Sequence, residues 1–195
     1  MVNSDLIKQL RDETLAPFID CKRVLEQTNG DISKAKDILK KEGLLRAQNK
    51  LTSQTKAGII EAYIHAGAKV GVLLDLRSET DFVAMNSEFK ALAHDIAMHI
   101  AAMNPTYVKS EDMPAEELEK LKNIYREQQA DSKKPAEVIE KIIEGRMQKE
   151  YEALCLLKQP FIKDESETIE NKIKLAIAKF GENIEVKRFI RFEID

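Results

Sequence analysis

Glu79-Thr80-Asp81-Phe82-Val83-Ala84 joins two segments whose patterns predict different secondary structures. Before it runs Lys69-Val70-Gly71-Val72-Leu73-Leu74-Asp75-Leu76-Arg77, an apolar segment typical of a buried strand. Residues 86–102 follow, and their apolar side chains recur at the spacing of one helix face: Phe89, Leu92, Ile96 and Ile100. The six residues therefore lie where a strand is replaced by a helix.

Phe82 lies at the expected start of that helix. Thr80 is a suitable N-cap, and Asp81 then falls in a first turn that favours negative charge. An aromatic ring at this point either packs into the core or points toward a partner. The pattern alone favours the core, because apolar side chains at helix starts commonly pack as hydrophobic staples.

Composition limits the classes of protein that the chain can belong to. It has 195 residues, 43% hydrophobic and 33% charged, which is enough for one substantial domain and a smaller one. The net charge of −3 gives no support to nucleic-acid binding through a basic surface. Cys21 and Cys155 fall on separate predicted helices, which indicates packed, reduced thiols. With no membrane-length apolar run and no signal-peptide pattern, we expect a soluble cytoplasmic protein.

The N-terminal segment predicts three short helices over residues 4–44. The second begins near Pro17, which suits a first helical turn, and the third is capped by Asp31, with Gly43 beyond its end. Residues 1–50 therefore form a three-helix module similar to the ubiquitin-associated fold. Such a module either docks on a partner or is only a packing unit, and its fold does not decide between the two.

Residues 51–195 predict an α+β core, and residues 46–56, across its boundary, predict a polar linker with some helical character at its start. Strand-like runs on both sides of Gly67, within residues 58–77, form a hairpin. A third strand covers residues 183–194 and alternates apolar side chains. We expect a small antiparallel sheet of about three strands packed with helices.

The residue types that carry catalysis do not form a recognisable motif. His94 and His99 are five residues apart and diverge on a helix, so they do not form a metal-binding pair. The cysteines have no metal-binding spacing, and the chain has neither a Walker A loop nor a dinucleotide fingerprint. Glu79 and Asp81 are neighbouring acids without the marks of a catalytic pair. The sequence thus indicates no catalytic residue, metal site or cofactor.

Short segments spread along nearly the whole chain carry a family resemblance. They are Leu10-Arg11 through Asp20-Cys21-Lys22, Asn29-Gly30-Asp31-Ile32, Tyr63-Ile64-His65, Lys69-Val70-Gly71-Val72-Leu73, Thr80-Asp81-Phe82-Val83, Asp95-Ile96-Ala97-Met98, Pro105-Thr106-Tyr107-Val108, Gly145-Arg146-Met147, Gln159-Pro160-Phe161, Gly181-Glu182-Asn183-Ile184 and Arg188-Phe189-Ile190-Arg191-Phe192. In this order they resemble the short form of bacterial translation elongation factor Ts. That family promotes exchange of GDP for GTP on the GTPase elongation factor Tu.

The resemblance assigns the exchange step to four residues. It implies that Phe82 acts as an apolar wedge between helices of the GTPase and disturbs its Mg²⁺ site. Asp81 accompanies the ring at the rim, while Thr80 and Val83 hold the turn. On this interpretation Phe82 contacts the partner and does not belong to the core, and the chemistry is entirely non-covalent.

The resemblance also implies a set of partner-binding residues: Arg11, Phe18, Ile19, His65, Gly181, Glu182 and Asn183. The chain departs from the family near the first three, because Leu15-Ala16-Pro17 stands where Gly-Ala-Gly is common, and proline stiffens the loop. The implied partner is elongation factor Tu, with self-association into a homodimer and with no direct nucleic-acid or membrane contact. No long heptad run or obvious apolar patch in the sequence specifies a dimer interface.

Two other functions remain open on sequence grounds. One is a ubiquitin-associated-like adaptor without exchange activity, in which residues 1–50 bind the partner. The other is a hydrolase that uses His65 and Asp81 and turns over substrate without any GTPase.

Overall fold

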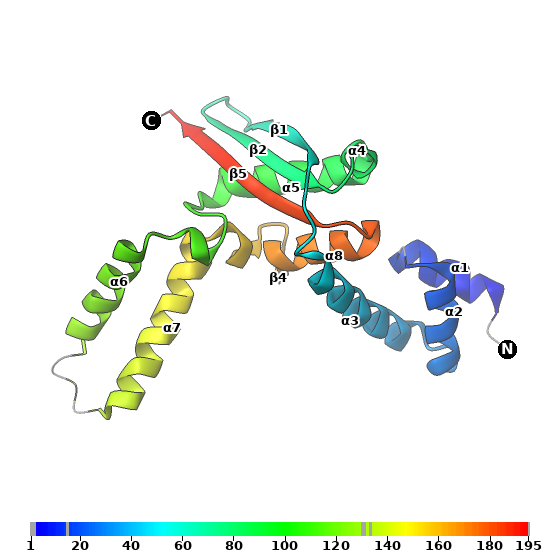
Figure 1. Ribbon diagram of the computed structural model, residues 1–195, viewed down its shortest axis with the longest axis horizontal. Helices are drawn as coiled ribbons and strands as arrows, with labels where there is room; N and C mark the ends of the chain where they lie inside the picture. The colour runs from blue at the N-terminus through cyan, green and yellow to red at the C-terminus, as the bar shows by residue number, and fades with distance from the viewer. Residues whose placement is uncertain (1–2, 15, 130–131, 133, 195) are drawn as a thin grey trace. The chain divides into compact units, whose positions relative to one another are not determined.

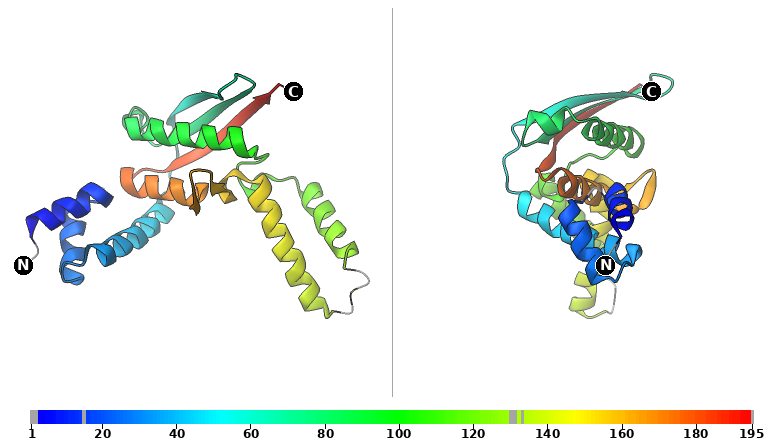
Figure 2. Two further views of the ribbon diagram at one scale, coloured as in Figure 1. Left: turned by 180° about the vertical axis from the view of Figure 1, so that it is seen from behind. Right: turned by 90° about the vertical axis from the view of Figure 1, so that its right-hand side faces the viewer.

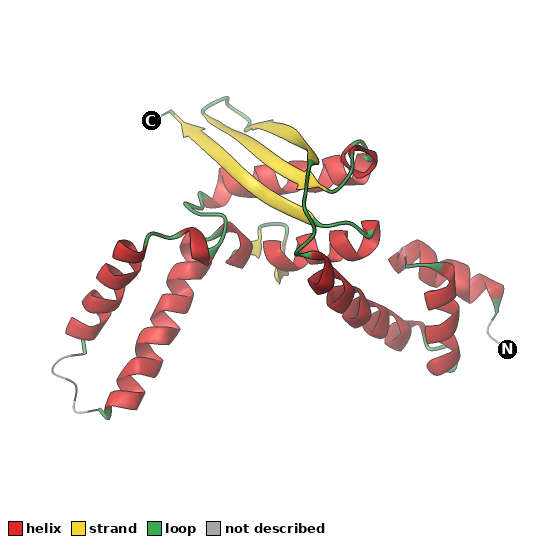
Figure 3. Ribbon diagram, viewed as in Figure 1, coloured by secondary structure: helices red, strands yellow, loops and turns green. Residues whose placement is uncertain are grey.

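The computed structural model describes residues 3–14, 16–129, 132 and 134–194 and has the expected α+β composition (Figures 1 and 3). Its elements are α1 (Ser4–Thr14), α2 (Phe18–Gln27), α3 (Ile32–Lys50), β1 (Ala57–Ile64), β2 (Val70–Ser78), α4 (Asp81–Ala84), α5 (Ser87–Met103), η1 (Ser110–Asp112), α6 (Ala115–Glu127), α7 (Ala136–Leu154), η2 (Leu156–Lys158), β3 (Pro160–Phe161), β4 (Asp164–Thr168), α8 (Ile169–Phe180) and β5 (Ile184–Glu193).

The chain divides into two compact units, and each combines segments that are distant in the sequence. The first unit contains Met1–Gly58, Arg77–Phe89 and Asn171–Glu185. The second contains Ile59–Leu76, Lys90–Glu170 and Val186–Asp195. Helices α1 to α4 and α8 thus belong to the first unit, whereas most of the sheet and helices α6 and α7 belong to the second.

Helices α1, α2 and α3 form the predicted three-helix module. One apolar cluster joins them, and its buried members are Ile7, Leu10, Cys21, Val24, Leu25, Ala35 and Leu39. The third helix begins as its cap predicts, because Asp31 Oδ1 accepts a hydrogen bond from Lys34 N at 3.0 Å. The module therefore has its own hydrophobic core.

Helix α3 is longer than its sequence pattern predicts. The expected end at Gly43 is wrong: the helix continues to Lys50, and the linker shortens to the residues after it. A Cβ built at Gly43 would lie 3.1 Å from the Cβ of Ala178 in α8. This glycine therefore allows a close approach of α3 and α8 and does not terminate the helix.

The sheet has the order β1-β2-β5 and is antiparallel, as predicted. The hairpin turns at Gly67 and Ala68, whose φ angles of 95° and 56° are both left-handed. Helix α5 lies along one face of the sheet (Figure 2). Arg191 Nε donates to the carbonyl of Ala101 in that helix at 3.1 Å. On β2 the buried residues of the covered face are Val72, Leu74 and Leu76.

Exposed apolar side chains gather on all three strands of the sheet and just beyond the end of β5: Ile60, Ile64, Leu73, Ile190, Phe192 and Ile194. On β2 and β5 they alternate with residues that are more buried or that contact α5, so they share the face opposite that helix. One ion pair crosses this face, between Arg188 Nε and Asp75 Oδ2 at 3.6 Å. The sequence showed no obvious apolar patch, whereas this face of the sheet carries one.

Two features of the second unit were not expected from the sequence. Strands β3 and β4 form a small antiparallel pair, in which Pro160 lies opposite Thr168. His99 is fully buried and hydrogen-bonds both to Gln159 and to the backbone N–H of Ile162 beside this pair. Cys155 is a buried free cysteine, as the sequence predicts, and burial raises the pKa of its thiol. Over the described ranges, no helix is long and apolar enough to cross a membrane.

Candidate functional site

Phe82 lies on the surface of the first unit. It belongs to the single turn of α4, and its side chain is 85% exposed, whereas Val83 and Ala84 are buried at 4% and 3%. Met85 follows with 76% exposure. The turn is thus anchored through its second half, and two large apolar side chains are left in solvent. A core position for Phe82 is excluded.

Thr80 holds the turn in a different way from a helix cap. It occupies the N-cap position of α4, with φ −128° and ψ 156°. Its hydroxyl donates to Glu182 Oε1 at 2.6 Å, and its backbone N–H donates to Glu182 Oε2 at 3.0 Å. The prediction that Thr80 is an N-cap is therefore confirmed for its position, but its hydroxyl bonds to a carboxylate 102 residues away in the sequence and not to the helix.

Glu79 links the same two chain segments with a hydrogen bond in the opposite direction. Its Oε1 accepts a hydrogen bond from the backbone N–H of Asn183 at 2.7 Å, and Lys50 Nζ lies 3.5 Å from the same oxygen. The Asn183 N–H, followed by the charge of Lys50, holds the pKa of Glu79 below its ordinary value. We call Glu79, Thr80, Glu182 and Asn183 the Glu79–Glu182 cluster. The sequence had pointed to Glu79 only as a neighbouring acid.

Gly181 brings Glu182 and Asn183 to this position. Its φ of +73° is left-handed, as is common just after a helix, and its N–H donates to Ile177 O at 2.8 Å to close α8. Asn183 is buried, and its Nδ2 donates to the carbonyls of Leu51 at 3.3 Å and Ser53 at 2.8 Å. The turn after α8 therefore also ties down the chain that leaves α3.

The predicted partner-binding residues of the three-helix module lie at its surface. Phe18 and Ile19 begin α2 and are 50% and 78% exposed, and Arg11 is exposed in the last turn of α1. Pro17 precedes Phe18 with φ −54°. Leu15, the first residue of the unusual Leu15-Ala16-Pro17 loop, lies outside the described residues.

His65 belongs to the second unit, in the turn of the β1–β2 hairpin. Its side chain is exposed, and its Nδ1 lies 3.1 Å from the hydroxyl of Tyr63. This contact holds the ring against the last residues of β1, the strand that ends just before His65.

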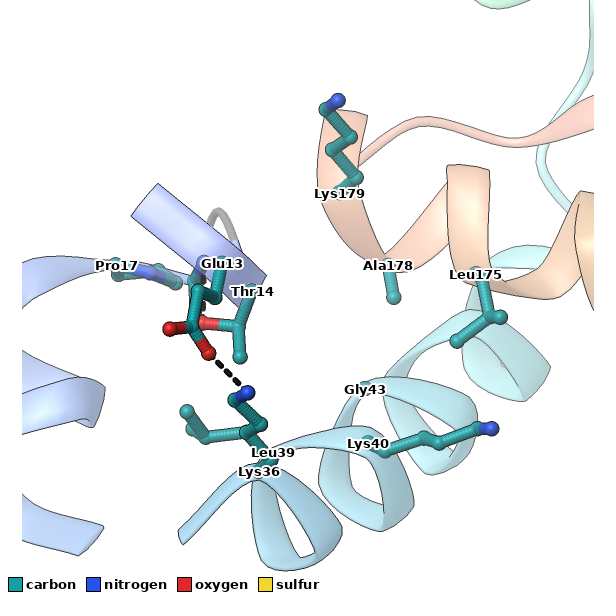
Figure 4. Close-up of a pocket in the computed structure, with 11 residues that line it drawn as sticks. Glu13, Thr14, Pro17, Lys36, Leu39, Lys40, Gly43, Leu175, Ala178 and Lys179 are labelled. Atoms are coloured by element: carbon teal, nitrogen blue, oxygen red, sulfur yellow. Dashed lines mark hydrogen bonds and ion pairs between the residues drawn. The ribbon is translucent and has the colours of Figure 1, made fainter. Parts of the chain in front are cut away.

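A cavity of about 280 Å³ opens in the first unit between the three-helix module and α8 (Figure 4). Leu39 and Gly43 line it from α3, and Leu175 and Ala178 from α8. Glu13 and Lys36 form an ion pair at its side. The lining has no cluster of nucleophilic or metal-binding groups, and across the described part of the chain no group of three or more His, Cys, Asp or Glu could hold a metal ion.

The fold and the exposed residues define a class of protein, a small α+β factor that presents apolar side chains on hydrogen-bonded turns. A family model described as elongation factor TS matches residues 41–195. The chain belongs to the elongation factor Ts family, and so it is a translation elongation factor.

Relatives from three bacteria agree with this assignment. The chain is 52% identical to an elongation factor Ts of Thermosipho melanesiensis, over 100% of this chain and 99% of that protein. It is 51% identical to that of Fervidobacterium nodosum, over 99% and 98%. With the protein of Koribacter versatilis it shares 50% identity, over 99% of this chain and 88% of the relative. These matches include the three-helix module, which begins before the region matched by the family model.

Proposed function

We propose that this protein binds elongation factor Tu in its GDP-bound state and promotes exchange of GDP for GTP. It acts non-covalently, and so it is not an enzyme in the sense of changing a covalent bond. The observation that carries the proposal is the 85% exposure of Phe82 on a turn whose next two residues, Val83 and Ala84, are buried. Membership of the elongation factor Ts family supports it from the side of sequence.

The energy available from Phe82 is sufficient for a measurable effect. Full burial of a large apolar side chain contributes about 1.5–3 kcal/mol. This corresponds to roughly a 10- to 100-fold change in an equilibrium constant. Because the ring is exposed in the free protein, this free energy is gained when a partner buries it. A ring that was already in the core would gain nothing on binding.

Exchange follows if the ring is buried better in one state of the partner than in another. A factor that binds the nucleotide-free GTPase more tightly than the GDP-bound form must weaken GDP binding by the same ratio. We propose that Phe82 enters between helices of the GTPase near the Mg²⁺ site, with Asp81 beside it. Thr80 and Val83 keep the turn in place. The Mg²⁺ concerned belongs to the partner.

The remaining predicted contacts form the docking part of the proposal. Arg11, Phe18 and Ile19 supply an exposed apolar and cationic surface on the three-helix module. His65 supplies a contact from the β1–β2 hairpin. For Gly181, Glu182 and Asn183, the hydrogen bonds inside the first unit favour a supporting role.

The test is release of fluorescent GDP from elongation factor Tu with the wild type and with Phe82→Ala. We expect the variant to slow factor-dependent release by about 10- to 100-fold at equal, subsaturating concentration, because the apolar burial is lost. Its melting temperature should change little. Phe89→Ala is the matched control, because Phe89 is fully buried and its truncation should cost about 3–5 kcal/mol of stability.

Normal GDP release by folded Phe82→Ala protein would contradict this function. If such a variant still bound the GTPase through the three-helix module, the adaptor without exchange activity would become the better interpretation.

A further inference from the structure

We infer that Glu79, Glu182 and Asn183 are positioning residues that hold the Phe82 turn ready for its partner. The inference rests on the proposed function and goes beyond it, because it assigns these residues an action through Phe82 and not a direct partner contact. It concerns only the first unit, which contains all of these residues.

Helix α4 cannot hold its own conformation. It has four residues, and a single turn is unfavourable in isolation because nucleation fixes several dihedral angles for little hydrogen bonding. Among the described residues, no side chain caps its N-terminus. The exposed ring of Phe82 adds nothing to the packing of the turn. The Phe82 turn must therefore be held from outside.

Two carboxylates hold it, and each accepts hydrogen bonds from the segment that carries the other carboxylate. Glu79, before α4, accepts from the backbone N–H of Asn183, after α8. Glu182, after α8, accepts from both the backbone N–H and the hydroxyl of Thr80, before α4. Hydrogen bonds to an ionised carboxylate are shorter and stronger than neutral ones. The two segments thus fix each other.

Asn183 extends the Glu79–Glu182 cluster to the end of α3. Its amide donates to the carbonyls of Leu51 and Ser53, and Lys50 pairs with Glu79. Its Oδ1 is buried without a hydrogen-bond partner among the described residues. The two donor bonds set the orientation of this amide, because a flipped amide would place its oxygen against two carbonyl oxygens. Three segments that are distant in sequence therefore meet at the base of the Phe82 turn.

This geometry argues against Glu182 as a partner contact. If its carboxylate turned toward another protein, the N–H and hydroxyl of Thr80 would both lose their acceptor. A turn that is already ordered, in contrast, loses less conformational entropy when Phe82 is buried by a partner. The cluster therefore raises the proportion of molecules in which the ring is presented in a binding-competent conformation.

The test uses full-length Glu182→Ala, with Glu165→Ala as a control that removes the same charge from an exposed position on β4. In the free protein, we expect amide hydrogen exchange of residues 83–85 to become about tenfold faster or more in Glu182→Ala, since a charge-assisted hydrogen bond is lost. GDP release from elongation factor Tu should slow by a similar factor. The control should leave both unchanged.

A double-mutant cycle separates positioning from direct contact. If Glu182 acts through Phe82, then adding Glu182→Ala to Phe82→Ala causes no further slowing. Full additivity, or unchanged amide exchange in Glu182→Ala, would overturn the inference. Failure of the proposed function would instead appear as normal GDP release by Phe82→Ala alone.

Should Glu182→Ala not fold, Thr80 supplies a second pair of variants. Thr80→Ser keeps the hydroxyl that donates to Glu182, and Thr80→Val removes it while keeping the shape. We expect faster amide exchange and slower GDP release only in Thr80→Val. Equal behaviour of the two variants would contradict the inference.

Discussion

His99 is a fully buried histidine whose two ring nitrogens both form hydrogen bonds. The backbone N–H of Ile162 donates to Nδ1 at 3.3 Å, so the proton of the neutral ring lies on Nε2 and is donated to Gln159 Oε1 at 3.0 Å. Gln159 in turn donates to the carbonyl of Ala153 at 2.7 Å. A second proton on Nδ1 would face the Ile162 N–H and break that bond.

Burial therefore lowers the pKa of His99 below its ordinary value of 6.5. Because the unfolded chain binds this proton more readily, the contribution of His99 to stability is complete above pH 6.5. It is lost progressively as the pH falls from there toward the lowered pKa of the folded state. The loss from one proton is at most about 1.4 kcal/mol per pH unit.

We expect His99→Gln to weaken this acid dependence of the free energy of unfolding, measured by urea denaturation between pH 7.5 and pH 5. Absolute stability will also change, so the relevant quantity is the difference between the two pH values. His65→Gln, at an exposed histidine, should keep the wild-type dependence. An unchanged acid dependence in His99→Gln would show that other groups cause it.

At the scale of single residues, the sequence indicated which residues are important better than it indicated what their side chains contact. It marked Phe82 by its position at a helix start, but that pattern alone favoured the core, and only the family resemblance pointed outward. Thr80 was expected to cap α4 because threonine commonly does so. Thr80 does occupy the N-cap position, but its hydroxyl donates to Glu182, and a partner 102 residues distant leaves no periodic signal in the sequence.

At the scale of elements, strong periodic patterns were sufficient to predict helices, but an isolated glycine was not sufficient to predict where a helix ends. The apolar spacing of Phe89, Leu92 and Ile96 predicted α5, and all three side chains are buried. Gly43 was interpreted as a helix terminator, although tertiary packing explains it: glycine lets α3 approach Ala178 of α8. The β3–β4 pair was missed because its strands are short and β4 is mostly polar.

This explanation of Gly43 leads to a stability prediction. Gly43→Leu forces a large side chain into the 3.1 Å approach to Ala178 and should destabilise the protein by about 1–3 kcal/mol. Gly145 is the matched control in the interior of α7, where a Cβ would meet open space. Gly145→Leu should be neutral or stabilise by up to about 1 kcal/mol, because leucine favours a helix. Urea denaturation of both variants measures the difference, and equal effects would refute the packing role.

At the scale of the whole molecule, the exposed sheet face favours the predicted self-association. Five large apolar side chains on three strands, with Ile194 just beyond β5, form a surface of the kind that proteins cover with a partner. We expect light scattering to show a dimer of the wild type.

Phe192→Arg should shift the protein toward monomer, because a charge would have to be buried at the interface. Ile162→Arg, at an exposed isoleucine between β3 and β4, should remain dimeric. A wild type that is monomeric over a wide concentration range would remove this prediction.

Docking and exchange should also be separable by substitution. Phe18 and Ile19 are exposed on the three-helix module, which has its own core, so their removal should not unfold the protein. We expect Phe18→Ala/Ile19→Ala to raise the concentration needed for half-maximal GDP release from elongation factor Tu by about tenfold or more, since apolar burial is lost. The maximal rate at saturation should stay near that of the wild type.

Phe82→Ala should have a different kinetic effect, a lower maximal rate at saturation, because its ring is proposed to act on the nucleotide site and not only on affinity. Point variants are preferable to deletion of residues 1–50, because α3 approaches α8 at Gly43 and Lys50 pairs with Glu79. Deletion would thus disturb the Glu79–Glu182 cluster together with the docking surface. If the Phe18/Ile19 double variant lowered the maximal rate as Phe82→Ala does, the module would take part in the exchange step, and the assignment of affinity to one surface and exchange to the other would be wrong.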